Sequence, residues 1–426
     1  MTDTEHLAGE RDPEGHLSYM GWRIVLTLFA VMTVLYGSAL YGFIILCRPL
    51  AELHGWSTSQ SGSLVSALWL AAPLALVSAP ILNRIGAWRL LLIGLLLIAG
   101  SFIALTITTE FWQVFLLRLI TSAGKVFAVV SIPVIVSQWF SRRFSLAIAA
   151  AYCGGSFGGL ILAPATEATI LALGWKAASL ALASLLLIVA AIVAALGRHS
   201  AVRNKAGTDT GSAEAEGVRP AWRTQISAID PFIAAPMALA VIFVGIGGMA
   251  YVISAPELLE AYGFSSTIAA TLLGLVAAGA MAGNLIAGWT LDRAKVVWTS
   301  IGAAAFIAVG LLLLHRLDVA PDLAAAIAAA LLIGSGIGAC EILWLTLTKR
   351  QFGAALFAIT YGCWSFCYQA GSIVGTALGG SIFAATSHAG FLVILAIIFA
   401  PAIAFSLWRP GMRNEEMPAV LKPQAT

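Results

Sequence analysis

Long uninterrupted runs of apolar residues dominate this chain of 426 residues, with short polar segments between them. Twelve runs reach the roughly 20 residues that an α-helix needs to cross a bilayer. They begin near Trp22, Ser57, Trp88, Phe111, Phe144, Gly174, Pro231, Ser266, Val297, Leu323, Phe352 and Gly390. The runs do not alternate apolar and polar residues as a transmembrane barrel does. The pattern therefore predicts an all-α membrane protein with twelve transmembrane helices.

Composition agrees with this class. Charged residues make up 10% of the chain and hydrophobic residues 60%, whereas soluble domains carry about 25% charged residues. The five cysteines form no metal-ligand or disulfide pattern, and no nucleophile triad or phosphate-binding loop is present. We therefore expect no metal, no cofactor, no nucleic-acid partner and no enzymatic activity.

The basic residues indicate the topology. If the N-terminus is cytoplasmic and the twelve helices alternate, 18 of the 23 Lys and Arg residues fall in cytoplasmic segments and three in outer segments. Cytoplasmic loops of membrane proteins carry such an excess. Both termini are therefore predicted to be cytoplasmic.

Polar segments divide the chain into five parts. Residues 1–20 are polar and lack a signal-peptide pattern, so they are predicted to be a disordered cytoplasmic tail. Residues 21–196 form a first six-helix bundle, and 197–229 form a flexible cytoplasmic linker. Residues 230–408 form a second six-helix bundle, and 409–426 form a second cytoplasmic tail.

The two bundles repeat one loop motif. Asn83 and Arg84 follow the second run, and Asp292 and Arg293 follow the eighth, 209 residues later, each in a small-xxx-(Asn/Asp)-Arg pattern. A parallel repeat of this kind is typical of transporters. We expect these four residues to form a cytoplasmic gate, in which charges pair when the inner side closes.

These loop motifs resemble those of the major facilitator superfamily. Within it, three segments are similar to the monocarboxylate transporter and oxalate–formate antiporter group: residues 48–57 (RPLAELHGWS), 138–143 (QWFSRR) and 174–176 (GWK). The resemblance implies two six-helix halves whose first, fourth, seventh and tenth helices line a central cavity. Asn83 replaces the usual Asp, and Asn284 stands where the group commonly has an Arg.

Two cations lie in the run that begins near Phe111. Lys125 is about 21 Å along that helix at 1.5 Å per residue, near mid-membrane, and Arg118 lies two turns earlier on the same face. Intramembrane charges are costly and mark functional sites by default. We expect both residues to bind an anion. The alternatives are an ion pair of Lys125 with Glu341 and a structural role for Arg118.

Glu341 is an acid in the tenth run, and three interpretations stay open. It carries a proton during transport, it pairs with Lys125, or it holds a cationic group of a zwitterionic substrate. The first two roles are compatible, because an anion on Lys125 would free Glu341 to take a proton.

Aromatic and amide residues are predicted to complete the substrate site, and packing is the alternative for each. They are Tyr36, Asn284, Tyr361, Trp364, Tyr368 and Gln369. Three of them, Tyr361, Trp364 and Tyr368, share a helix face, which favours an organic substrate. Arg48 is predicted either to attract anions at the outer vestibule or to extend toward the surface as an end residue.

The sequence thus predicts a monomeric secondary transporter of the inner (plasma) membrane. It is expected to move a small organic anion, a carboxylate by preference, with protons as the coupling ion, by rocker-switch alternating access. The alternatives are a carrier of zwitterionic or amphipathic compounds and a non-transporting receptor that has kept the fold.

Overall fold

The computed structural model describes residues 14, 16, 19–207, 229–293 and 296–407. Every regular element in these residues is helical. The tail and linker predictions for residues 1–13, 208–228 and 409–426 lie outside the described residues.

The first half of the chain forms one group of helices. They are α1 (Met20–Tyr36), the π-helix η2 (Gly37–Gly42), α2 (Phe43–His54), α3 (Thr58–Ser66), the 3-10 helix η3 (Ala67–Trp69), α4 (Pro73–Ile85), α5 (Ala87–Leu105), α6 (Phe111–Trp139), α7 (Phe144–Leu173) and α8 (Trp175–Gly207). The helix α8 continues to Gly207, so part of the predicted linker is helical.

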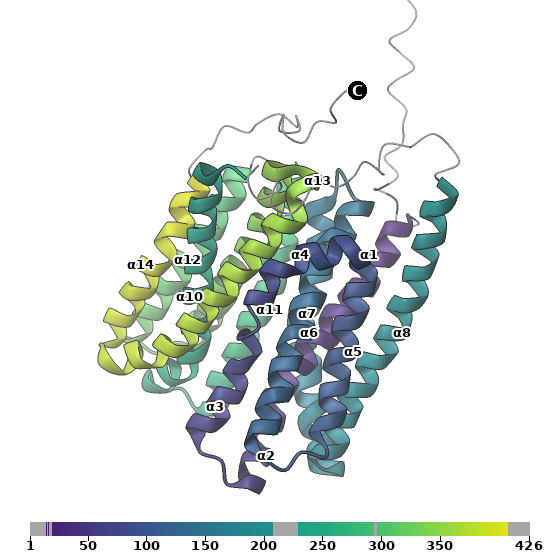
Figure 1. The fold of residues 1–426 in the computed structure, drawn as a ribbon. Helices are drawn as coiled ribbons and strands as arrows, with labels where there is room; N and C mark the ends of the chain where they lie inside the picture. The colour runs from purple at the N-terminus through teal and green to yellow at the C-terminus, as the bar shows by residue number, and fades with distance from the viewer. Residues whose placement is uncertain (1–13, 15, 17–18, 208–228, 294–295, 408–426) are drawn as a thin grey trace, which may run out of the picture.

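The second half forms a second group. Its helices are α10 (Pro231–Ala261), α11 (Ser266–Arg293), α12 (Val296–Leu317), α13 (Leu323–Ala385) and α14 (His388–Leu407). The two groups lie side by side, the first in purple to teal and the second in green to yellow (Figure 1).

Ten segments of the described residues are long and apolar enough to cross a membrane. A helix of 63 residues, α13, contains two of the predicted runs, joined where Gly353 adopts φ 65° and ψ 177°. A positive φ costs glycine little, so the chain changes direction there. A shorter apolar helix, His388–Pro401, overlaps the last predicted run. The count of twelve spans and the side on which the termini lie stay predictions.

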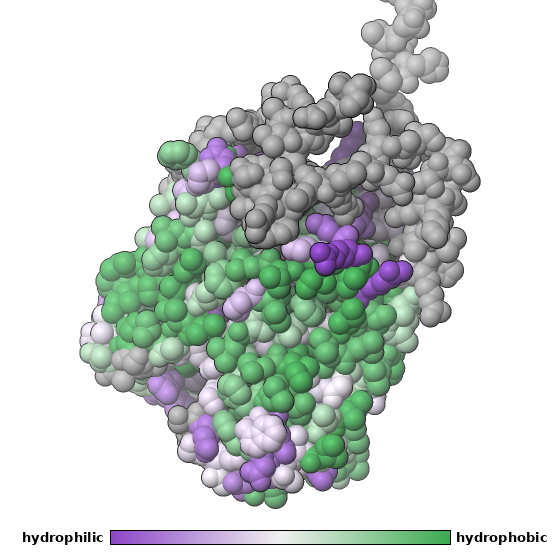
Figure 2. Space-filling model, viewed as in Figure 1, coloured by the Kyte–Doolittle hydropathy of each residue, from purple (hydrophilic) through white to green (hydrophobic). Residues whose placement is uncertain are grey.

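The surface matches a membrane protein. An apolar band crosses the middle of the visible face, with hydrophilic residues toward both ends (Figure 2). Many large apolar side chains of the protein are exposed, among them Leu116, Ile188 and Leu312. Lipid tails solvate such side chains, so a multi-pass membrane protein tolerates them.

Glycines bring the two halves into close contact. A Cβ atom at Gly288 of α11 would lie 2.7 Å from the carbonyl oxygen of Ser145 in α7, and one at Gly362 of α13 would lie 2.6 Å from that of Ala75 in α4. Small residues allow this backbone approach in lipid. The interface between the halves therefore follows α7 against α11 and α4 against α13.

Candidate functional site

The second span is interrupted in its middle. The helix α3 ends at Ser66, the 3-10 turn η3 follows, and α4 begins only at Pro73. Proline removes a backbone donor and disfavours helix at the residue before it. Ser122 of α6 compensates, because its hydroxyl donates to the Leu68 carbonyl at 2.6 Å and accepts from the Ala71 N–H at 3.1 Å. Interrupted helices of this kind commonly form substrate and ion sites in transporters.

Lys125 lies on α6 one turn after Ser122, beside this interruption. Its Nζ is 3.7 Å from the centroid of the Trp69 ring, and the side chain is 2% exposed. The amine has no hydrogen-bond partner among the described residues. A cation over an indole face is attracted by the ring quadrupole, most strongly where water is absent. Trp69 is thus the immediate partner of the amine.

Arg118 is held differently. Its Nε donates to the Leu64 carbonyl at 3.1 Å, its Nη1 donates to the Ala39 carbonyl at 2.9 Å, and its guanidinium carbon lies 3.7 Å from the Phe43 ring centroid. Ala39 belongs to the π-helix η2, whose i→i+5 pattern is frequent at functional sites. Arg118 therefore connects α6 to the first two spans, which favours the structural alternative.

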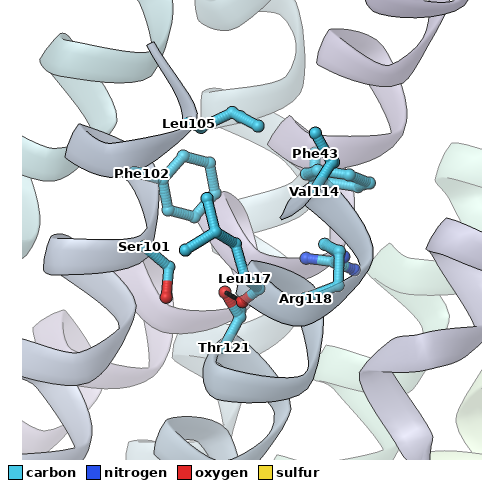
Figure 3. Close-up of a pocket in the computed structure, with 8 residues that line it drawn as sticks. All are labelled: Phe43, Ser101, Phe102, Leu105, Val114, Leu117, Arg118 and Thr121. Carbon is cyan, nitrogen blue, oxygen red and sulfur yellow. Dashed lines mark hydrogen bonds between the residues drawn. The ribbon is translucent and has the colours of Figure 1, made fainter. Parts of the chain in front are cut away.

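A small recess lies on one side of Arg118, between α5 and α6. Figure 3 shows Arg118 next to Phe43 and Val114, with Ser101 of α5 across the recess. Arg118 and Lys125 also repel each other electrostatically, so the two cations share one region of α6.

Glu341 of α13 lies in a different environment. It is near enough to interact electrostatically with Tyr36, Tyr41, Tyr152, Tyr361 and Tyr368, which we call the tyrosine cluster. The Tyr152 and Tyr361 hydroxyls are 2.7 Å apart and join α7 to α13.

Several groups of this region retain accessible surface. Glu341, Tyr36, Tyr41 and Tyr368 are partly exposed although they lie in the apolar part of the bundle. An acid and phenol groups that are deep but reachable suit a substrate or proton pathway.

Lys125 and Glu341 do not form an ion pair in the described part of the chain, whose ion pairs include Arg48–Glu52 and His388–Asp318. Aromatic residues connect their surroundings instead. The ring of Trp69 meets that of Tyr368 edge to face, with centroids 6.4 Å apart, and Tyr368 interacts with Glu341.

Seven further buried polar atoms lack a partner among the described residues: Arg118 Nη2, Ser254 Oγ, Tyr262 Oη, Asn284 Oδ1, Trp344 Nε1, Trp364 Nε1 and Gln369 Oε1. Trp344 stacks on Tyr361 with centroids 5.4 Å apart, and the Gln369 amide donates to the Ser365 carbonyl. A buried polar group without a partner costs about 1–3 kcal/mol, so such atoms require an explanation. A ligand or water between the halves would supply one.

Asp292 joins the halves at the N-terminus of α7. Its carboxylate accepts from the Ser145 N–H at 3.1 Å and from the Leu146 N–H at 2.9 Å. Anions are favoured at helix N-termini. Nearby, the Thr346 hydroxyl donates to the Ser145 hydroxyl, and Lys349 Nζ donates to the Phe140 carbonyl at 2.7 Å.

The other predicted gate residues are placed differently. Arg293 lies over Trp289 of its own helix, with 4.7 Å from guanidinium carbon to ring centroid. Asn83 and Arg84 are exposed. Arg48 is on the surface, where its side chain is 84% exposed and its Nε bonds Glu52 at 3.2 Å.

Glu14 is a residue that the sequence placed in the disordered tail, yet it is 8% exposed. Its carboxylate accepts from the N–H groups of Ser141, Arg142 and Arg143 and from the Ser141 hydroxyl. No sequence signal connects residues that are 127 positions apart.

Trp69 is a second residue that the sequence analysis missed. An indole within an apolar run is typical of a packed core residue, so its type gives no functional signal.

Comparison with known proteins identifies relatives. The sequence model of the Major Facilitator Superfamily matches residues 27–362 and 237–424. Human monocarboxylate transporter 7 is 28% identical over 161 residues, 37% of this chain and 30% of that protein. Mouse monocarboxylate transporter 11 is 29% identical over 308 residues, 68% of this chain and 65% of that protein. The matches thus span between 30% and 65% of these relatives.

Two solved structures share the fold. The transporter FucP in the outward conformation has a TM-score of 0.68 at 15% identity, covering 91% of this chain and 99% of that one. The proton:xylose symporter XylE has a TM-score of 0.71 at 14% identity, covering 91% and 95%. At these identities the likeness shows the fold alone.

Proposed function

Because this chain belongs to the Major Facilitator Superfamily and is similar to its monocarboxylate transporters, we propose that it moves a small organic anion, a carboxylate by preference, across the inner membrane. The chain is a multi-pass transporter and not an enzyme. The observation that carries the anion proposal is the buried Lys125 amine, which has no acidic partner among the described residues.

A carboxylate would complete the bonding of this amine. An ammonium group in a site without water gains more from a charged acceptor than from a ring face, because charge-assisted hydrogen bonds are the strong ones. The unpaired indole donors of Trp344 and Trp364 would favour the same kind of ligand, since N–H groups bind acceptors.

Transport proceeds by alternating access. The contacts of Asp292, Thr346 and Lys349 with α7 and with the segment before it hold the halves together at one end of the bundle. In a rocker switch these contacts break when that side opens.

Glu341 is the proposed proton carrier. It is an acid near phenol groups and without a basic partner in the described residues, so a proton would neutralise it during the transition between states. Anion and proton would then enter together as a symport.

A second candidate substrate class has its own support. The tyrosine cluster around the Glu341 carboxylate is a suitable environment for an organic cation, because both carboxylates and aromatic faces attract positive charge. A zwitterion that bridges Glu341 and Lys125 would use both sites, in exchange or efflux.

Counterflow in proteoliposomes tests the proposal. Vesicles loaded with L-lactate, benzoate, oxalate, glycine or choline are diluted into the labelled compound. We expect exchange of one or more carboxylates, and a loss of about 100-fold or more in Lys125→Ala, since the intramembrane cation is the anion's charge partner. Lys176→Ala, which removes an exposed lysine, is the matched control. Carboxylate exchange by Lys125→Ala at the wild-type rate would refute the anion site.

A further inference from the structure

The Trp69 ring covers one face of the Lys125 amine. The Lys125 Nζ lies 3.7 Å from the ring centroid, Trp69 is 5% exposed, and Lys125 is 2% exposed. An acceptor cannot reach the face of the amine that the indole covers. The ring therefore excludes both water and solute from this face.

The contact also compensates the amine for its missing counterion. Burial of an ammonium group away from water is costly unless another group interacts with the charge. Among the described residues the indole is the partner in contact, because the amine has no hydrogen bond and Arg118 is a like charge. Trp69 thus stabilises the state in which no anion is bound.

The backbone that carries the ring is not part of a continuous helix. Trp69 ends the 3-10 turn, and residues 70–72 separate it from α4. Ser122 binds the flanking Leu68 carbonyl and Ala71 N–H, so the interruption is anchored beside Lys125.

The Trp69 ring also contacts the other half of the protein. Trp69 meets Tyr368 of α13 at an interplanar angle of 68°, and Tyr368 is partly exposed beside Glu341. When the halves rotate relative to each other, Tyr368 moves with α13, so the ring contact between Tyr368 and Trp69 changes.

We propose that Trp69 is an exchangeable cover of the Lys125 site, so that its indole and the carboxylate of the substrate compete for one amine. The anion binds when the ring leaves, and the ring returns when the anion has gone. The Tyr368 contact couples this exchange to the movement of the halves. The inference rests on the proposed function, because it takes Lys125 as the anion site.

Chemical labelling of the amine tests the cover without knowledge of the substrate. The purified full-length protein is methylated with ¹³C-formaldehyde and dimethylamine–borane, and Lys125 is followed by peptide mass spectrometry. Wild type is compared with Trp69→Phe and Trp69→Leu, and the exposed Lys176 is the internal control.

We expect Lys125 to react about ten-fold faster in Trp69→Leu than in wild type, with Trp69→Phe between them, because Phe is a weaker cation–π partner than Trp. Lys176 should react equally in all three. An unchanged Lys125 rate in the variants would overturn the cover. Equal acceleration by Phe and Leu would also overturn it, since that result indicates loosened packing. If Trp69→Leu does not fold, the methylation rate of Lys125 in Trp69→Phe, compared with wild type, tests the proposal.

A second arm separates this inference from the anion site itself. Benzoate, L-lactate and oxalate are added as probes, and we expect one or more of them to slow methylation of Lys125 at lower concentration in Trp69→Leu than in wild type. If the carboxylates protect Lys125 from methylation equally in wild type and Trp69→Leu, competition between indole and carboxylate is refuted, but the anion site is supported. If Lys125 is labelled faster in Trp69→Leu but none of these carboxylates slows the labelling, the anion site is refuted. The proposed competition between indole and substrate is then refuted as well.

Discussion

The hydroxyl of Tyr152 lies 2.7 Å from that of Tyr361 and forms a hydrogen bond between α7 of the first half and α13 of the second. Both groups belong to the tyrosine cluster near Glu341. The bond therefore connects the candidate proton carrier with the movement that alternating access requires.

Removal of one hydroxyl of this pair should shift the conformational equilibrium. In Tyr152→Phe the Tyr361 hydroxyl keeps no partner in this contact, and an unmatched buried group costs about 1–3 kcal/mol. We expect the variant to populate the state with separated halves more than wild type, in spin-label distance distributions across α7 and α13. The double variant Tyr152→Phe/Tyr361→Phe should lie closer to wild type, because neither polar group is then stranded. A double variant shifted as strongly as Tyr152→Phe, or more strongly, would contradict this account.

Arg118→Lys should separate the two interpretations of Arg118. Lysine cannot reproduce the fork that bonds the Leu64 and Ala39 carbonyls, and hydrogen bonds from charged groups are worth about 1.5–3 kcal/mol each. We expect a lower melting temperature with carboxylate affinity nearly unchanged, measured by differential scanning fluorimetry and ligand binding. Wild-type stability with weakened carboxylate binding would assign Arg118 to the anion site instead.

Asp292 should stabilise the closed contact through the N-terminus of α7. Its two oxygens accept from separate N–H groups, and a carboxylate at a helix N-terminus contributes about 0.3–2 kcal/mol. We expect Asp292→Ala to raise thiol accessibility at the α7–α11 interface, with Asp292→Asn intermediate because it keeps one acceptor oxygen. Glu257→Gln, which neutralises an exposed acid, is the control and should not change accessibility. Unchanged accessibility in Asp292→Ala would exclude this contact from the gate.

Glu14 should make stability depend on pH. Burial raises the pKa of this carboxyl, but hydrogen bonds from Ser141, Arg143 and Arg142 lower it more, so the pKa lies below its ordinary value of 4.5. A carboxyl with a lowered pKa in the folded state contributes stability above the unfolded pKa, and this contribution disappears as pH falls through the folded pKa.

We expect Glu14→Gln to melt at a lower temperature than wild type at pH 7. The difference should shrink as the pH is lowered from about 5, because wild type then loses what the variant already lacks. Melting curves at a series of pH values measure this difference. A difference that stays constant down to pH 3 would show that the carboxylate charge of Glu14 is not involved.

The sequence predicted the helical framework because hydrophobic runs of membrane length allow few other structures. Lys125 and Glu341 stood out for the same reason, as charges inside such runs. The interruption of the second span was not predicted, because the 3-10 turn before Pro73 depends on Ser122 from another helix. The family predicted from the sequence is confirmed. The roles of Lys125 and Glu341 stay predictions.

Partners of the site residues could not be predicted. Arg118 and Asp292 bind backbone groups, which carry no residue-specific signal. Trp69 is indistinguishable by type from the aromatic residues that pack in any apolar run. Only the three-dimensional arrangement connects each of them with a partner far along the chain.

A structure of the wild-type protein with a carboxylate selected by counterflow tests the central claim most directly. The account predicts a carboxylate oxygen about 2.7–2.9 Å from Lys125 Nζ, with the Trp69 indole displaced from the amine. A transported carboxylate bound elsewhere, with the amine still covered by Trp69, would contradict it.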